Sequence, residues 1–330
     1  MITVINYADI KYRQTQILCT ETAKRFGADQ VWEYSPTSIP EDFRQAHKEI
    51  LSMKRGNGYW LWKPLIILDA LEKVNDGDYV FYIDAGAAVV DDIHHLINAM
   101  NNADANIMTF VGSAIEKVWT KRDAFLLMDC DSPEYTDTPQ ISATYSVYKK
   151  CSESIEFVRE WLQYMTDPRI VTDMPNQLGQ PNYPEFRENR HDQTVLSLLA
   201  KKHKLPLFRY PSSPSNAGYP KDVAERSPYP KITDSHRRRY WIMTAGEYLK
   251  LNSRKTTTER GLECVFVLIT EKLYSEALVM LHKIALSDTH THKGRCEMHG
   301  MNCRKLFDWR MKFKTKFTEK QSGISFTKSY

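Results

Sequence analysis

The chain has 330 residues, of which 42% are hydrophobic and 26% are charged. This is the composition of an ordinary globular protein, and it excludes general disorder and fibrous repeats. A net charge of +4 is too small to indicate a nucleic-acid partner, and no apolar stretch is long enough to cross a bilayer.

The N-terminus begins directly with a β-like run and has neither the charged start nor the cleavage site of a secretory signal. Six scattered cysteines in a chain of this size do not indicate a disulfide framework. We therefore expect a cytoplasmic protein with reduced thiols.

The first part of the sequence alternates short apolar runs, typical of buried strands, with segments of helical periodicity. In chain order we expect a strand at 2–5, a helix at 15–26 that ends at Gly27, a strand at 30–34, helices at 41–52 and 65–74, and a strand at 78–83. The last strand lies between Asp76-Gly77 and Asp84-Ala85-Gly86, and it is the best candidate for the centre of a sheet.

The second part continues the alternation but contains two long segments of loop composition. We expect a helix at 91–100, strands at 105–110 and 141–148, helices at 153–165 and 192–203, and a short strand at 207–210. The Asp- and Pro-containing stretch between 110 and 141 predicts a loop, and 167–190 predicts a long active-site loop or flexible lid.

Strands that alternate with helices favour a mainly parallel or mixed α/β sheet with helices on both faces. We expect this domain to span residues 1–243. Residues 244–330 would then form a C-terminal appendage, helical at first and ending in a basic tail that contains Cys and His residues.

The run Tyr82-Ile83-Asp84-Ala85-Gly86 places a carboxylate at the carboxyl end of an apolar strand. Ligands of open α/β sheets bind beyond such strand ends, and the small Ala85 and Gly86 would let a diphosphate sugar approach the backbone. Asp84 would hold a divalent cation that neutralises the phosphates. The alternative is that Asp84 only caps the turn that follows.

The run Arg55-Gly56-Asn57-Gly58-Tyr59-Trp60-Leu61-Trp62-Lys63-Pro64 combines a glycine-containing backbone with three aromatic rings and two cations. Tyr59, Trp60 and Trp62 offer flat faces for a base or a sugar ring. Arg55 and Lys63 offer positive charge to phosphate groups. The alternative is that the aromatic residues belong to an ordinary hydrophobic core.

Two further polar runs suit a site. Asn189-Arg190-His191-Asp192-Gln193 opens a predicted helix, whose positive end favours an anionic group, although Asp192 alone is also explained as a helix cap. Ser235-His236-Arg237-Arg238-Arg239 brings a histidine that would complete a metal site with Asp84, and arginines for diphosphate oxygens. A solvated basic loop is the alternative here.

These four stretches, in this order, resemble a family of bacterial and viral glycosyltransferases with the type-A glycosyltransferase fold. The similarity covers about residues 2–241 and rests mainly on the Trp-Lys-Pro and Asp-Ala-Gly elements. The segment Gln140-Ile141-Ser142-Ala143 is similar to the part of that family that lines the acceptor side of the cleft. One departure is Gly86, which stands where the Asp-x-Asp signature of the fold has its second carboxylate.

The resemblance implies transfer of a hexosyl or related group from a nucleotide sugar to a hydroxyl of a glycan or lipid-linked acceptor, as in surface polysaccharide synthesis. It implies donor contacts from Tyr82 to Gly86, from the run at 55–63 and from Arg237. A Mn or Mg ion would be held by Asp84 and His236, and the acceptor by Gln140, Ser142 and Gln193. Asp192, with His191 beside it, is our candidate for the catalytic base.

Two other functions stay open at this point. A sugar-phosphate nucleotidyltransferase has a related core but usually needs a glycine-rich phosphate loop, which Asn6-Tyr7-Ala8-Asp9 does not supply. A catalytically inactive glycan-binding protein would keep the fold without turnover.

The C-terminal tail carries two further hypotheses. The first is a structural zinc site at His292, Cys296, His299 and Cys303, whose spacing matches no strong finger pattern. Beyond it, aromatic residues alternate with cations at 307–314. Such a ribbon would rest on an anionic membrane, giving a peripheral position at the inner membrane face, or it is an edge strand with one solvated face.

Overall fold

The computed structural model describes residues 1–235. The expected domain boundary at 243, the Cys/His cluster and the basic tail lie outside these residues. Within the described part, no helix is both long enough and apolar enough to span a membrane.

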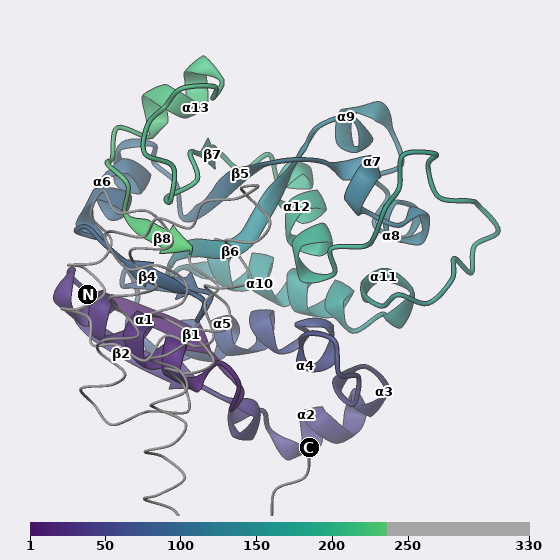
Figure 1. Cartoon of the computed structure of the whole chain (residues 1–330), viewed down its shortest axis with the longest axis horizontal. Coiled ribbons are helices and arrows are strands. Elements are labelled where there is room, and N and C mark those ends of the chain that lie inside the picture. Colours follow the sequence, from purple (N-terminus) through teal and green to yellow (C-terminus); the bar gives the residue numbers. More distant parts are fainter. Residues whose placement is uncertain (236–330) are drawn as a thin grey trace, which may run out of the picture. The chain divides into compact units, whose positions relative to one another are not determined.

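A six-stranded sheet forms the centre of the described part (Figure 1), with the strand order β2-β1-β3-β6-β5-β7. Its strands are β1 (Ile2–Tyr7), β2 (Gln30–Tyr34), β3 (Tyr79–Ile83), β5 (Ile107–Ile115), β6 (Pro139–Lys149) and β7 (Leu207–Phe208). β1 is parallel to β2 and β3, and β5 is parallel to β7, whereas β6 is antiparallel to both of its neighbours. The predicted mixed, mainly parallel α/β sheet is confirmed.

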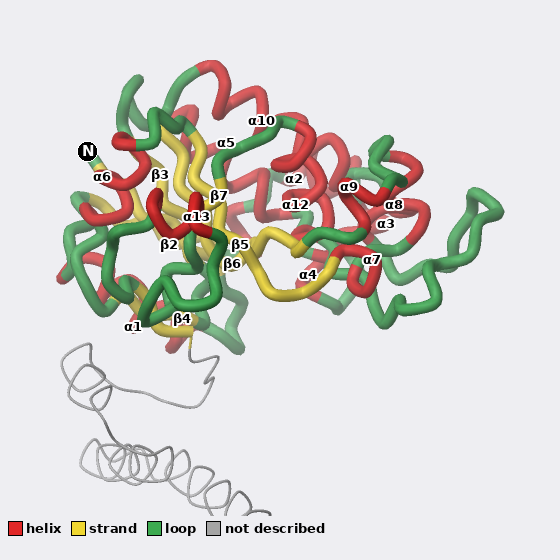
Figure 2. Tube along the Cα trace, turned by 90° about the horizontal axis from the view of Figure 1, so that it is seen from above, coloured by secondary structure: helices red, strands yellow, loops and turns green. Residues whose placement is uncertain are grey.

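Each face of the sheet carries its own hydrophobic core, because neighbouring residues of a strand point to opposite sides. Ile5 and Tyr82 pack on one side with α5 (Trp62–Lys73), α10 (Ser152–Met165) and α12 (Asp192–Lys202). Val4 and Phe81 pack on the other side with α1 (Arg13–Arg25) and α6 (His94–Asn102). Figure 2 shows the strands between these two groups of helices.

Three short elements lie beside this sheet in the chain order. β4 (Ala87–Val89) follows β3 and pairs antiparallel with β8 (Thr233–Ser235). Helix α13 (Lys221–Arg226) precedes β8. Gly27 follows the end of α1 with a φ of +102°, so its predicted role as a helix stop is confirmed.

The prediction of one continuous helix at 41–52 is wrong. The structure has α2 (Glu41–Ala46) and α3 (Lys48–Leu51), separated at His47, whose φ of −116° and ψ of 29° are not helical. Hydrophobic periodicity continues through such a break, so the sequence pattern does not reveal it.

The predicted loop between 110 and 141 is also wrong. It contains three short helices, α7 (Glu116–Trp119), α8 (Arg122–Leu127) and α9 (Pro133–Thr136). α9 begins with a proline at its first position, where the missing N–H costs nothing. Such one-turn helices are too short to produce a clear hydrophobic period.

The segment 167–190 is irregular apart from α11 (Pro168–Val171), as its composition predicted. It is nevertheless anchored to α8. The buried Asp123 accepts the backbone N–H groups of Gln177 and Leu178, and the Asn182 side chain accepts the N–H of Arg122. These hydrogen bonds hold the segment against α8, and its residues 188–190 line the cavity described below.

Candidate functional site

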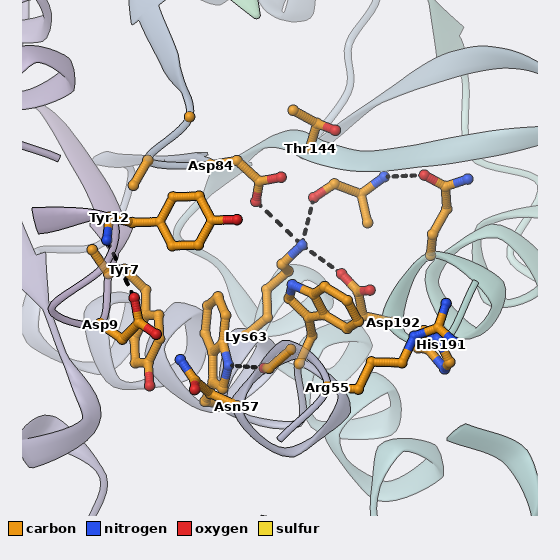
Figure 3. Close-up of a pocket in the computed structure, with 18 of the residues that line it drawn as sticks. Tyr7, Asp9, Tyr12, Arg55, Asn57, Lys63, Asp84, Thr144, His191 and Asp192 are labelled. Atoms are coloured by element: carbon orange, nitrogen blue, oxygen red, sulfur yellow. Dashed lines mark hydrogen bonds and ion pairs between the residues drawn. The ribbon is translucent and has the colours of Figure 1, made fainter. Parts of the chain in front are cut away.

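A cavity of about 600 Å³ lies at the carboxyl ends of β1 and β3 (Figure 3). Its walls come from segments far apart in the sequence: the turn after β1, residues 54–63, the turn after β3, and residues 188–193 at the start of α12. This is the place where open α/β sheets bind their ligands.

The cavity lies where the pairing of β3 with β6 ends. The last paired residues are Ile83 and Tyr145, followed by one hydrogen bond from Asp84 N to the Thr144 oxygen (3.0 Å). Beyond it, two backbone N–H groups of β6 donate to side chains of α12. Ile141 N donates to Ser197 Oγ (2.8 Å) and Ala143 N donates to Gln193 Oε1 (3.4 Å). Gln193 and Ser197 are one helical turn apart and so face the strand together.

Lys63 joins the two carboxylates that the sequence singled out. Its Nζ lies 2.5 Å from Asp192 Oδ2 and 3.4 Å from Asp84 Oδ1, and it donates to the backbone oxygen of Ala143 at 3.0 Å. Burial alone would lower the pKa of Lys63, but the two adjacent carboxylates raise it, so the ammonium stays charged. Within the described residues the ammonium thus has one hydrogen bond and two ion pairs.

Lys63 lines the cavity, and its predicted role as a phosphate ligand stays a prediction. Its side chain is 3% exposed, and its charge is used by the protein itself. Lys63 balances the charge of Asp84 and Asp192, which would otherwise repel each other and any phosphate between them.

One oxygen of Asp84 is held by a hydrogen bond, and the side chain is open to the cavity. Tyr82 Oη donates to Asp84 Oδ1 at 2.6 Å, while the Asp84 side chain is 38% exposed toward the cavity. Tyr82 is buried but borders the cavity, and its hydrogen bond orients Asp84. Its predicted contact with a donor stays a prediction. The Ala85-Gly86 turn lines the cavity as predicted.

Asp192 differs from Asp84 in its environment. Its side chain is 8% exposed, and burial raises its pKa to about 6, although Lys63 acts in the opposite direction. The carboxylate is thus ionised at neutral pH and accepts a proton more readily than an exposed aspartate does.

His191 precedes Asp192 with φ 54° and ψ −110°, a strained backbone conformation for a residue other than glycine. Its ring is stacked on Trp60 with 5.5 Å between centroids, and it lies 4.9 Å from Tyr59. Nδ1 lies 2.6 Å from the backbone oxygen of Val171, and burial lowers the pKa of the imidazole. A neutral, tightly packed His191 fixes the position from which Asp192 begins α12.

Residues 56–60 form a left-handed turn, since five consecutive residues have φ between 50° and 91°. Left-handed backbone costs about 1–2 kcal/mol for each residue that is not glycine. Gly58 is required here for a second reason, because a Cβ would lie 2.6 Å from Leu51 Cα. Trp62 Nε1 donates to the Gly56 oxygen at 2.9 Å and helps to hold the turn.

The aromatic residues at 59–62 mainly contact other residues of the protein. Trp62 is stacked on Tyr7, with centroids 3.7 Å apart and an interplanar angle of 13°. Tyr59 does not line the cavity, and its hydroxyl donates to Asp173 Oδ2 at 3.1 Å. The predicted donor contact is therefore wrong for Tyr59, whereas Trp60 and Trp62 line the cavity.

Arg55 lines the cavity, but its guanidinium is already paired. Nη1 lies 3.0 Å from Asp173 Oδ2 and Nη2 lies 3.1 Å from Glu188 Oε2. These bonds connect the segment before the left-handed turn to the wall formed by 173–190.

The acceptor-side prediction is wrong for Gln140 and Ser142, neither of which lines the cavity. Gln140 is fully buried, and its Nε2 donates to the buried Glu116 Oε2 at 3.0 Å. Its Oε1 accepts from Gln193 Nε2 at 2.7 Å. Gln193 does line the cavity, and Thr144 lines it in place of Ser142.

Sequence reasoning named no site residue in the turn after β1. Tyr7, Ala8, Asp9, Lys11 and Tyr12 all line the cavity. Asp9 Oδ1 accepts the N–H groups of Lys11 and Tyr12 at 2.9 and 3.2 Å, which fixes this turn. The strand-end rule that selected Asp84 applies equally to the parallel β1 and would have found these residues.

His236 and Arg237 lie outside the described residues, as do His292, Cys296, His299 and Cys303. Among residues 1–235, no group of three or more His, Cys, Asp or Glu side chains is arranged to hold a metal ion. Ser235, the last described residue, lines the cavity, and its Oγ lies 2.6 Å from Tyr145 Oη.

No protein-family model matches the chain, and no curated protein matches it at a significant level. Similar solved structures include the galactosyltransferase LgtC in complex with donor and acceptor sugar analogs, with 14% identity and a TM-score of 0.42, covering 78% of this chain and 99% of that chain. A glycosyltransferase involved in glycosylation of the major capsid of PBCV-1 has 15% identity and a TM-score of 0.35, covering 70% and 91%.

The bifunctional glycosyltransferase WbbM has 12% identity and a TM-score of 0.35, covering 60% of this chain. The similarity spans 37% of the length of WbbM. Identities and TM-scores this low do not decide the function, which depends on the residues of the cavity.

Proposed function

We propose that this protein is a glycosyltransferase that moves a hexosyl or related group from a nucleotide sugar to a hydroxyl of a glycan or lipid-linked acceptor. The observation that carries the proposal is the placement of two unlike carboxylates on one buried ammonium. Asp84 is partly exposed at a strand end, whereas Asp192 is buried and has a raised pKa. Direct displacement of a diphosphate by a hydroxyl can use two such groups, one beside the leaving group and one as the base.

The donor would lie across the ends of β1 and β3. Ala85 and Gly86 leave room for a diphosphate to approach the backbone beside Asp84. In Figure 3 the ring of Tyr12 reaches toward the space beside Asp84, where its face suits a nucleobase or a sugar. The volume of about 600 Å³ is in the range of small-molecule sites.

Asp192 would act on the acceptor. Its carboxylate takes the proton of the attacking hydroxyl while the bond from the anomeric carbon to the diphosphate oxygen breaks and the new glycosidic bond forms. Lys63 holds one oxygen of Asp192, so the other oxygen is the proton acceptor. This sequence of events inverts the anomeric centre.

A divalent cation, Mn or Mg, is part of the proposal. Asp84 suits it chemically, because Oδ1 receives the hydrogen bond of Tyr82 and Oδ2 accepts none from the described residues. The described residues hold no group of three metal-ligating side chains, so phosphate oxygens and water would provide most other ligands, with His236 as a further candidate. The ion would neutralise the departing diphosphate.

The test is thermal stabilisation of the full-length protein by a panel of nucleoside diphosphates, with and without manganese. Wild type is compared with Asp84→Ala and with Asp76→Ala, which removes a carboxylate that is 93% exposed and outside the cavity. We expect one nucleotide to stabilise wild type and Asp76→Ala but not Asp84→Ala. The same nucleotide sugar should then be turned over with release of its nucleoside diphosphate, and no response to any nucleotide would refute the proposal.

A further inference from the structure

Five lysine and arginine residues line the cavity, and three of them are committed to partners within the protein. Lys63 forms ion pairs with Asp84 and Asp192 and donates to the Ala143 oxygen. Arg55 is paired with Asp173 and Glu188. The Arg190 guanidinium lies 3.9 Å from the centre of the Trp119 ring and 3.7 Å from Glu188.

Lys11 and Lys54 are different. Both are exposed and line the same cavity, Lys11 from the turn after β1 and Lys54 from the segment before the left-handed turn. Neither ammonium forms an ion pair or a hydrogen bond with any residue in 1–235. They are therefore the cavity cations of this region whose charge is available to a ligand.

The backbone beside Lys54 offers further donors. Within the described part of the chain, the N–H groups of Lys54, Arg55 and Gly56 donate no hydrogen bond. All three residues line the cavity, where the chain changes from ordinary to left-handed backbone at Gly56. Consecutive unpaired N–H groups at such a change of hand, with an ammonium beside them, suit the oxygens of a phosphate.

We propose that Lys11 and Lys54, together with the backbone N–H groups of residues 54–56, form the phosphate-binding part of the cavity. The assignment rests on the proposed function, which supplies a phosphate-bearing ligand, and it replaces Lys63 as the phosphate contact. The phosphate belongs either to the nucleotide donor or to a lipid-linked acceptor, since both carry the same chemistry.

The test uses inorganic pyrophosphate as the probe, with the full-length protein in metal-free buffer of low ionic strength and titration calorimetry as the readout. The variants are the double substitution K11A/K54A, the charge-preserving K11R/K54R and the control Lys48→Ala. Lys48 is an exposed lysine on α3 that does not line the cavity. Because all these positions are on the surface, unfolding temperatures should be nearly equal.

We expect K11A/K54A to bind pyrophosphate at least tenfold more weakly than wild type, and to lose most of the salt dependence of binding. Lys48→Ala should bind like wild type, and K11R/K54R should retain most of the affinity. The assignment is overturned if K11A/K54A binds as tightly as Lys48→Ala, or if wild type does not bind pyrophosphate.

Competition separates the two sources of phosphate. If a nucleoside diphosphate displaces pyrophosphate and also depends on both lysines, the subsite belongs to the donor. If the two bind together, it belongs to a second, phosphate-bearing substrate. Lysine-dependent binding of pyrophosphate without binding of any nucleotide would support the subsite and refute the glycosyltransferase proposal. Nucleotide binding together with pyrophosphate binding that does not depend on either lysine would refute the subsite and leave the glycosyltransferase proposal standing.

Discussion

Lys63 Nζ lies 2.5 Å from Asp192 Oδ2, and the two side chains are only 3% and 8% exposed. Removal of one member of a buried ion pair leaves the other charged without compensation. We therefore expect Lys63→Met to lower the free energy of unfolding by about 3–5 kcal/mol, measured by chemical denaturation.

Lys73 provides the control for that measurement. It forms an ion pair with Asp69 at 2.7 Å, but both side chains are exposed, by 58% and 39%. Lys73→Met should change the unfolding free energy by less than about 1 kcal/mol. If both variants had the same small effect, the buried charge cluster would not contribute as described.

The raised pKa of Asp192, about 6, has opposite consequences for stability and for activity. The folded protein binds this proton more tightly than the unfolded chain, whose aspartate has a pKa near ~3.9. The contribution of Asp192 to stability is thus complete below pH ~4, decreases as the pH rises toward about 6, and is constant above that.

Activity should follow the ionised base instead. The kcat/KM of wild type should rise with pH through about 6 and then level off. Asp192→Asn should lose about 10²–10⁴-fold in kcat/KM. Its remaining activity should lack the rise near pH 6, and a pH profile that is unchanged in this variant would rule out Asp192 as the titrating base.

Tyr82 orients Asp84 through a hydrogen bond of 2.6 Å. Tyr82→Phe should weaken nucleotide binding in the presence of manganese by about fivefold, corresponding to about 1 kcal/mol for one hydrogen bond. Tyr148→Phe is the matched control, because Tyr148 is equally buried on the neighbouring strand β6 but does not line the cavity. Equal affinities of the two variants would show that Tyr82 does not support Asp84.

Gly58 and Gly77 both have positive φ, 91° and 82°, but only Gly58 is surrounded by other atoms. Gly77→Ala should cost about 1–2 kcal/mol from backbone strain alone. Gly58→Ala should cost at least ~2 kcal/mol more, because its Cβ would collide with Leu51. Thermal or chemical denaturation measures the difference, and similar losses would mean that the left-handed turn adapts to a larger residue.

The sheet was largely predictable from the sequence. β3 and β6 are apolar runs with turn residues beside them. Strands that are buried on both faces have nearly continuous apolar sequences, which makes them easy to identify. The break at His47 and the one-turn helices at 116–136 were not predictable, because a dihedral change or a single turn does not alter the hydrophobic period.

The two carboxylates of the site were predictable from the sequence. The ion pairs that connect them through a lysine were not. Asp84 follows a central strand and Asp192 opens a helix, and local patterns identify both positions. That Lys63 lies between them depends on the tertiary fold, as does the burial of Gln140 against Glu116. The sequence did not predict that Lys11 and Lys54 line the cavity, because lysines are common in turns and only the fold shows their neighbours.

The position of Asp192 in the sequence also bears on the order of folding during synthesis. The strands β1 and β3 and the helix that carries Lys63 leave the ribosome well before α12, so at that stage the ammonium has Asp84 but lacks its nearest carboxylate. Burial of a charge without sufficient compensation is costly, so Lys63 should remain hydrated until α12 arrives. We therefore expect nascent chains that end before α12 to be open at the cavity and to depend on chaperones.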